Sequence, residues 1–194
     1  PTLFSDDMHV LDPKKNAAFE FCEAELYLAY KEGKLVGRVA AIINHKANKQ
    51  WDTKAVRFGW IDFIDDIEVS RALLDAVGNY GKAHGMDNII GPLGFTDMDP
   101  EGMLTDGFDQ LGTMATLYNY PYYPRHMQEL GGWEKDNDYV EYKLIVPKEM
   151  PEKYMKVAQM IEKRYDLHVR AMTRREIFKD GYGHKVFEVI NETF

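Results

Sequence analysis

The sequence predicts an α/β fold in which a mixed central sheet is flanked by helices, and two patterns carry this prediction. The first is a pair of apolar, β-rich runs, 25–30 and 35–43, separated by the turn-forming letters KEGK, which indicates an antiparallel β-hairpin. The second is a strand pattern over 56–64, a helical pattern over 69–80 and a short apolar run over 86–93. Strand, helix and strand in this order indicate a right-handed crossover that places two strands in parallel.

The central strand alternates between two kinds of position. Successive side chains of a strand point to opposite faces, so we expect Phe58, Trp60, Asp62 and Ile64 to share one face of the sheet. The helix that follows is expected to end near Gly85, because glycine readily adopts the conformation that closes a helix.

Three carboxylates, Asp65, Asp66 and Glu68, stand where the strand passes into the helix. Asp65 and Glu68 are three residues apart, the spacing at which a cap residue and a first-turn carboxylate can each satisfy a free backbone N–H group. A helix start attracts anions because it carries partial positive charge and unpaired N–H groups. Since the protein's own acids are placed to occupy it, we predict a capped structural helix and a poor phosphate site.

Weaker patterns cover the rest of the chain. Residues 1–16 show no sustained period, which predicts an irregular lead-in, and residues 94–121 are rich in Gly, Pro and Asp, which predicts a long loop. The remaining predicted elements are a helix over 124–130, a strand over 139–146, a helix over 152–165, a strand over 168–172 and an amphipathic helix over 183–194. We expect one domain over 1–147, and an appendage of helix, strand and helix over 148–194.

Composition bounds the partners and the compartment. The 194 residues carry a net charge of −8 with a pI near 5.3, which argues against nucleic acid or an anionic membrane as the main partner, since both require clustered Lys and Arg. Cys22 is the single cysteine, which excludes an intrachain disulfide, and its flanks predict a buried structural thiol. No run approaches the length of a membrane span, so we expect a cytoplasmic protein. The apolar side chains of the last predicted helix need a partner, so we expect this helix to fold back on the chain, to form a homodimer with a second copy, or to pair with a second half of similar fold.

No metal is expected. The six histidines show no metal-ligand spacing. The segment 97–102 begins like a calcium-binding loop, with acids at its first, third and fifth positions, but the twelfth position, which must supply a bidentate Glu, is Phe108.

The order of elements, together with the segments AELYLAYKEGKLVGRVAAIIN and LGGWEKDNDYVEYKL, resembles the GNAT superfamily of acyl-CoA N-acyltransferases. The resemblance covers roughly 25–144 and rests on order and pattern more than on any single motif. It looks closest to a bacterial branch in which two GNAT-like halves follow one another, and HVRAMTRREIFKDGYGHKVFEVINETF resembles the start of a second half. The resemblance implies an acyltransferase that uses acetyl-CoA or another acyl-CoA and acts on a small-molecule amine.

Two departures from the family pattern bear on activity. The family holds the CoA diphosphate with a Gln/Arg-x-x-Gly-x-Gly/Ala turn after the central strand, whereas this chain has Asp65, Asp66 and Glu68 there and no glycine. A like-charge contact near 4 Å costs about 4 kcal/mol at an effective dielectric constant of about 20. The family's acid tyrosine corresponds to Gln128, or to Met127 in the other register, and neither can protonate a thiolate. We therefore expect that this half does not bind CoA in the usual way.

A group of aromatic residues around two prolines is the main candidate for a substrate site. It consists of Tyr118, Asn119, Tyr120, Tyr122 and Tyr123. Rigid rings with hydroxyl groups suit the wall of a ligand pocket, and an aromatic cover over the sheet edge is the equal alternative. His126, on the short helix that follows, is a further candidate contact.

The central strand adds two candidates to this pocket, Trp60 and Asp62. In a geometry like that of the superfamily, Asp62 could act as the general base for an amine. The alternative is an ordinary solvated aspartate at a strand end.

Two functions from different classes are consistent with these patterns. In the first, the chain is part of an acyl-CoA-dependent N-acyltransferase whose phosphate-binding turn is degenerate in this half. In the second, it is a non-catalytic GNAT-like module that binds a ligand or pairs with another half.

Overall fold

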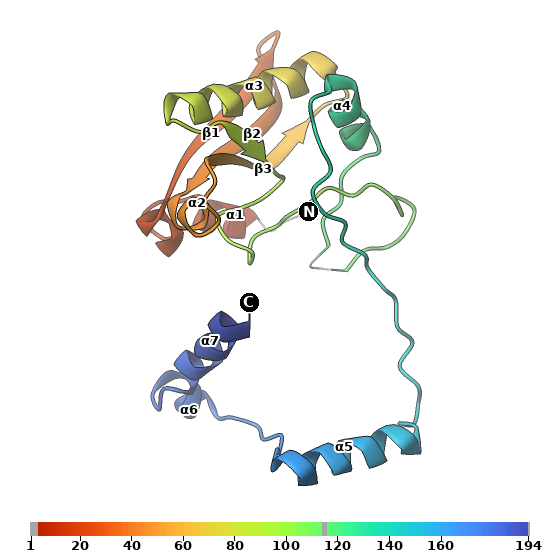
Figure 1. The fold of residues 1–194 in the computed structure, drawn as a ribbon. Coiled ribbons are helices and arrows are strands. Elements are labelled where there is room, and N and C mark those ends of the chain that lie inside the picture. Colours follow the sequence, from red (N-terminus) through yellow and green to blue (C-terminus); the bar gives the residue numbers. More distant parts are fainter. Residues whose placement is uncertain (1–3, 114–115, 194) are drawn as a thin grey trace. The chain divides into compact units, whose positions relative to one another are not determined.

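The computed structural model describes residues 4–113 and 116–193, and the chain divides into two compact units, Pro1–Tyr139 and Val140–Phe194 (Figure 1). The first unit contains α1 (Phe4–Val10), η1 (Ala17–Glu20), β1 (Cys22–Lys31), β2 (Lys34–Asn44), α2 (His45–Gln50), β3 (Ala55–Phe63), α3 (Ile67–Ala83), β4 (Asn88–Ile90) and α4 (Tyr122–Leu130). The second unit contains α5 (Glu152–Tyr165), α6 (Arg174–Phe178) and α7 (Tyr182–Thr193).

The first unit is built on a mixed sheet with the strand order β1-β2-β3-β4. β1 and β2 form the predicted antiparallel hairpin, and their turn places Glu32 and Gly33 at φ angles of 52° and 76°. β3 is antiparallel to β2 and parallel to β4, and α3 forms the crossover between β3 and β4. The prediction of an α/β fold with a hairpin and a strand-helix-strand crossover is therefore confirmed.

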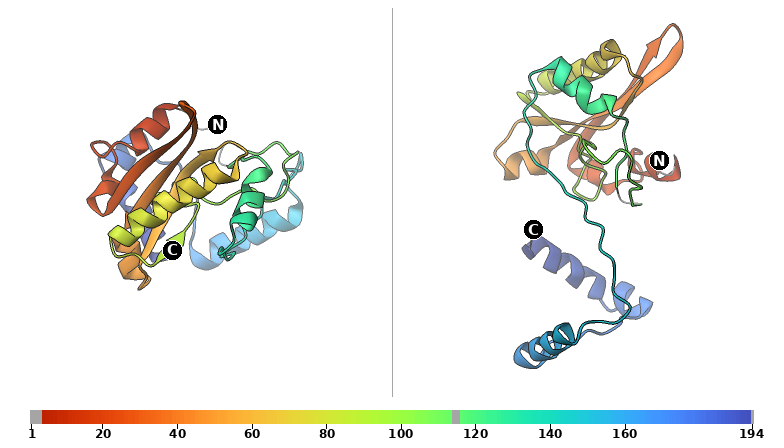
Figure 2. Two further views of the ribbon diagram at one scale, coloured as in Figure 1. Left: turned by 90° about the horizontal axis from the view of Figure 1, so that it is seen from above. Right: turned by 90° about the vertical axis from the view of Figure 1, so that its right-hand side faces the viewer.

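Apolar side chains cover both faces of this sheet. α3 packs along one face, where Val39, Phe58 and Leu73 are among the buried residues, and α4 lies beside the N-terminal end of α3 (Figure 2). On the other face, Phe95 from the long loop packs with Ala18 of η1 and with Ala40 and Ile42 of β2. The loop thus supplies one of the largest fully buried side chains of the unit.

A bulge in β3 corrects the predicted face of Phe58. Gly59 pairs with Ala40 and Asp62 pairs with Arg38, so β3 has one residue more than β2 between these pairs. The extra residue reverses the alternation beyond the bulge, where Trp60 has a φ angle of 47°.

The bulge separates side chains that strict alternation would place together. Phe58 joins Ile61 and Phe63 in the core beneath α3, whereas Trp60 packs with Phe95 in the cluster on the other face. The prediction that Phe58 and Trp60 share one face of the sheet was therefore wrong.

Several local predictions outside the central sheet were also wrong. The lead-in 1–16 contains α1, and the predicted strands over 139–146 and 168–172 do not form. A strand needs a partner for its N–H and C=O groups, and within the described residues no strand pairs with either segment. Leu144 is accordingly 84% exposed and Val169 is fully exposed.

The helices predicted at 124–130, 152–165 and 183–194 are present as α4, α5 and α7, although Phe194 lies outside the described residues. The two units divide between residues 139 and 140, and the idea that 148–194 begins a second GNAT-like half stays a prediction. In the described part of the chain, none of the helices combines the length and the apolar character that crossing a bilayer requires.

Candidate functional site

Asp62 lies near the end of β3, beyond the bulge, and two neighbouring side chains fix its position. Its Oδ2 atom accepts a hydrogen bond from Arg38 Nε at 2.7 Å, and its Oδ1 atom accepts one from the Tyr123 hydroxyl at 3.3 Å. The same tyrosine hydroxyl accepts the backbone N–H of Phe63 at 3.3 Å. The Asp62 side chain nevertheless remains 57% exposed, so its carboxylate is both held in place and open to a ligand.

Arg38 connects Asp62 to Trp60 through α1. Its Nη1 atom lies 3.3 Å from Oδ2 of Asp7, and the indole N–H of Trp60 donates to Oδ1 of Asp7 at 3.2 Å. The structure therefore brings the two predicted residues of β3 into one polar network. The positively charged Arg38 lies between two carboxylates in this network.

Burial governs the chemistry of Tyr123. Its side chain is 7% exposed, and this burial raises the pKa of the hydroxyl far above its ordinary value of 10. The hydroxyl therefore stays protonated and can donate its hydrogen bond to Asp62 at any pH in the physiological range.

The predicted aromatic cluster is a continuous series of ring contacts. Tyr118 contacts Tyr120 at 6.0 Å between ring centroids, and Tyr120 stacks on Tyr122 at 5.7 Å. Tyr122 donates to the carbonyl oxygen of Phe63 at 2.6 Å, and Phe63 stacks on Tyr123 at 4.2 Å. The series therefore runs from the surface to the end of β3.

The outer end of this cluster is accessible. Tyr118 and Tyr120 are 58% and 59% exposed. Asn119 lies between them, and its side chain accepts the backbone N–H of Leu104 at 2.7 Å and donates to the carbonyl oxygen of Leu104 at 3.1 Å. These two hydrogen bonds join two parts of the long loop. Asn119 thus positions the loop, and the exposed rings are the groups of this cluster that a ligand can reach.

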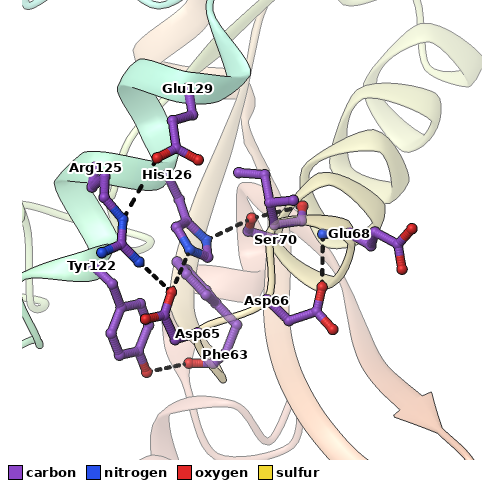
Figure 3. Close-up of polar contacts among 10 residues, drawn as sticks. Phe63, Asp65, Asp66, Glu68, Ser70, Tyr122, Arg125, His126 and Glu129 are labelled. Carbon is purple, nitrogen blue, oxygen red and sulfur yellow. Dashed lines mark hydrogen bonds and ion pairs between the residues drawn. The ribbon is translucent and has the colours of Figure 1, made fainter.

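His126 lies in the interior and joins α4 to α3 (Figure 3). It is 2% exposed, its Nδ1 atom lies 3.0 Å from the Ser70 hydroxyl, and its Nε2 atom lies 2.9 Å from Asp65. Arg125 forms an ion pair with the same aspartate. Both ring nitrogens are thus engaged, and the contact of His126 with substrate stays a prediction.

The series Ser70, His126 and Asp65 has the connectivity of a hydrolase triad but not its accessibility. Ser70 is completely buried, and its hydroxyl also donates a hydrogen bond to the carbonyl oxygen of Ile67 at 3.1 Å. A nucleophile must reach its substrate, so this arrangement stabilises the packing of α4 on α3.

The three carboxylates at the start of α3 have separate roles, which corrects the predicted cap. The N-cap is Asp66, whose side chain accepts the backbone N–H of Glu68 at 3.0 Å, whereas Asp65 points to α4 (Figure 3). Lys31 bridges Asp66 at 2.7 Å and Glu68 at 3.3 Å. Lys31 and Arg125 relieve part of the repulsion between the three carboxylates. The backbone N–H of Glu68 is nevertheless occupied by Asp66, and the surroundings of the helix start are acidic. The side chains at this helix start therefore do not favour a diphosphate, and the expectation that this half does not bind CoA in the usual way stays a prediction.

The cap leads to a prediction on pH dependence. Lys31 and the backbone N–H of Glu68 lower the pKa of Asp66 below its ordinary value of 3.8. A lowered pKa stabilises the folded state above the unfolded pKa, and this stabilisation disappears as the pH falls through the folded pKa. We expect Asp66→Asn, which keeps the cap but removes the charge, to be less stable than the wild type near neutral pH and equally stable in strong acid. Urea unfolding across this pH range measures the difference. If the stability difference caused by Asp66→Asn were the same in a Lys31→Met background, the contact with Lys31 would not be the source of that difference.

The prediction about the cysteine can be checked directly. Cys22 is 4% exposed, and burial raises the pKa of its thiol to about 11, so the predicted buried structural cysteine is confirmed. Among the residues that the structure describes, no three His, Cys, Asp or Glu side chains come together in a way that would hold a metal.

Sequence reasoning missed Arg38 and Asp7. Arg38 sits in an apolar strand and Asp7 in a segment expected to be irregular, so neither follows a recognisable motif. Arg38 lies opposite Asp62 only in the pairing of β2 with β3, so no pattern within either strand could have indicated it.

Comparison with known proteins finds two relatives. Protein YghO of Escherichia coli (strain K12) is 26% identical over an alignment of 201 residues, which covers 94% of this chain and 52% of that protein. Bacterial ceramide synthase of Caulobacter vibrioides is 28% identical over an alignment of 192 residues, which covers 93% of this chain and 49% of that protein. The chain thus spans about half the length of the curated relatives it matches. No protein-family model matches the chain, and no solved structure matches it. The chain is therefore similar to YghO and to a bacterial ceramide synthase over nearly all of its length, and its mixed α/β fold is compatible with a GNAT-like fold.

Proposed function

We propose that the chain is part of an acyl-CoA-dependent N-acyltransferase that acts on an amphipathic amine. The observation that carries this proposal is the position of Asp62, held by Arg38 and Tyr123 yet 57% exposed, at the inner end of a series of ring contacts whose outer rings are exposed. A ceramide is the amide formed when the nitrogen of a long-chain amino alcohol is acylated, so the similarity to a bacterial ceramide synthase supports acyl transfer of this kind.

Asp62 would bind the amine and take up its proton. In the overall reaction the neutral amine attacks the thioester carbonyl, the C–N bond forms as the C–S bond breaks, and the proton that the nitrogen loses ends on the sulfur, which leaves as a thiol. A substrate that arrives as an ammonium must first give up one further proton, which Asp62 would take up and pass to water. An ammonium group at the open side of Asp62 would meet a carboxylate whose orientation is already fixed, and positioning of this kind lowers the barrier. Because the start of α3 is acidic, the proposal places the phosphates of the acyl donor elsewhere.

The exposed rings of Tyr118 and Tyr120 would contact the apolar part of the amine. Their hydroxyl groups tolerate water while the rings supply apolar area, which suits a substrate with one polar and one apolar end. A long-chain amino alcohol is the substrate class that combines these properties.

The experiment is a direct assay for amide formation. The chain is incubated with a long-chain acyl-CoA and a long-chain amino alcohol, and the amide and the released thiol are measured by mass spectrometry and a thiol reagent. We expect both products in equal amounts, and a lower rate with a short-chain amine. If the chain bound the long-chain amino alcohol but formed neither the amide nor the thiol, the proposed acyltransferase activity would be contradicted.

A non-catalytic ligand-binding or pairing module is the second candidate. It is favoured by the acidic start of α3 and by Gln128, which stands where the family pattern has an acid tyrosine. A ligand that binds only the folded state must raise its thermal stability. This candidate therefore predicts stabilisation by amines without any turnover. A cytoplasmic location and pairing with a second copy stay predictions under either candidate.

A further inference from the structure

The second unit carries a positively charged hollow that the proposed function does not use. α6 and the residue after it line a surface hollow of about 440 Å³ with Arg174, Arg175, Phe178 and Lys179. Three of these side chains are cations, and the fourth is an aromatic ring that is 75% exposed. Such a group stands out in a chain with a net charge of −8.

The acidic residue within α6 does not neutralise the hollow, because its contacts lie outside the lining residues. Glu176 forms an ion pair with Arg170 at 3.1 Å. It also accepts the backbone N–H and the hydroxyl of Thr173 at 2.8 Å and 2.9 Å, as part of the capping box of α6. Its carboxylate is therefore committed to Arg170 and Thr173.

Few acidic side chains lie close enough to neutralise the positive charges of the hollow. Arg175 Nε lies 3.9 Å from Asp180, at the limit of an ion pair. Within the residues that the structure describes, neither Arg174 nor Lys179 has an acidic partner within ion-pair distance. Arg175 and Lys179 are also four residues apart, a spacing at which like charges on a helix repel. A bound anion would relieve this repulsion.

The surrounding sequence extends the positive charge beyond the hollow. Residues 163–185 contain seven Lys or Arg and three Asp or Glu, so this segment is basic within an acidic chain. A local excess of one sign raises the concentration of oppositely charged ligands near the surface.

The aromatic ring of the hollow adds a second type of contact. The guanidinium carbon of Arg174 lies 5.8 Å from the centre of the Phe178 ring, so an arginine and an exposed ring share one side of the hollow. Arginine binds phosphate through several donors, and an exposed ring can stack on a flat base. We propose that this hollow binds a phosphate-bearing ligand with a flat ring, the chemistry of a nucleotide. The proposal does not depend on the acyltransferase activity, because it concerns binding alone.

Calorimetry with adenosine 3′,5′-bisphosphate tests the site directly. We expect the 194-residue chain to bind this probe, and the affinity to fall as salt is raised. The double substitution Arg174→Gln and Lys179→Gln should weaken binding at least about tenfold, since hydrogen bonds to charged groups are the strong ones at such a site. The matched control is Lys153→Gln with Lys163→Gln on α5, which removes the same charge away from the hollow and should leave the affinity within about twofold.

Two further measurements separate the parts of the proposal. Phe178→Ala should weaken the adenosine bisphosphate but leave inorganic phosphate unaffected, because only the former has a ring to stack. Equal weakening by the α5 control, or no binding of the adenosine bisphosphate at low salt, would overturn the site. Binding to phosphatidic acid vesicles without any binding of the soluble nucleotide would overturn the nucleotide assignment and indicate a lipid headgroup as the source of the phosphate. Circular dichroism of each variant checks that the helices remain folded.

Discussion

Replacing Asp62 with asparagine is expected to lower kcat/KM for amide formation by about a hundredfold or more, the range in which a positioned acid or base contributes. Asparagine retains the size of the side chain and can still accept a hydrogen bond from Arg38, but it cannot take up the proton of the amine. The Asp62 side chain is 57% exposed, and exposed ion pairs contribute little to stability. The loss should therefore appear in turnover and not in folding.

The matched control is Asp75→Asn, which removes the same charge from an exposed position on α3. We expect it to retain the activity of the wild type. If Asp62→Asn and Asp75→Asn were equally active, Asp62 would be an ordinary solvated aspartate and the proposed base would have to be abandoned. A wild type that binds the amine without turning it over would instead favour the non-catalytic module.

Replacing Phe58 with alanine is expected to lower the free energy of unfolding of the first unit by about 3–5 kcal/mol. Phe58 is fully buried beneath α3, and its ring meets the edge of Trp133 at 5.6 Å between centroids. Its removal leaves a cavity between β3 and the helix layer. Since domains of this kind have only about 5–15 kcal/mol of stability, the unit should approach unfolding.

Urea unfolding followed by tryptophan fluorescence measures this change, because all three tryptophans lie in the first unit. The control is Met98→Ala, at a side chain that is 92% exposed, and its midpoint should match that of the wild type. Equal midpoints for Phe58→Ala and Met98→Ala would mean that Phe58 does not contribute to the core as the structure indicates.

The elements that the sequence could predict are those whose causes are local. The hairpin depends on a two-residue turn that Glu32 and Gly33 supply, and the helices α3, α5 and α7 follow from apolar residues at helical spacing. The acidic start of α3 is equally local, because charge and capping act within one turn. The prediction of a poor phosphate site could therefore be made without tertiary contacts.

Long-range pairing decided what local pattern could not. The bulge at Trp60 exists only in the pairing of β3 with β2, and it moves Phe58 to the face opposite the one that Trp60 occupies. The run over 139–146 has the composition of a strand, but among the described residues no strand of the sheet lies beside it, so it does not form a strand.

The candidate site also combines features that the sequence could predict with features that only long-range contacts decide. The sequence by itself singled out Asp62 and the tyrosines as residue types that suit an amine site. Only the tertiary structure placed Arg38 against Asp62, and Asp65 against a histidine 61 residues further along the chain. The physical reason is that hydrogen bonds and ion pairs between side chains depend on which elements fold together, and no pattern within a single helix or strand contains that information.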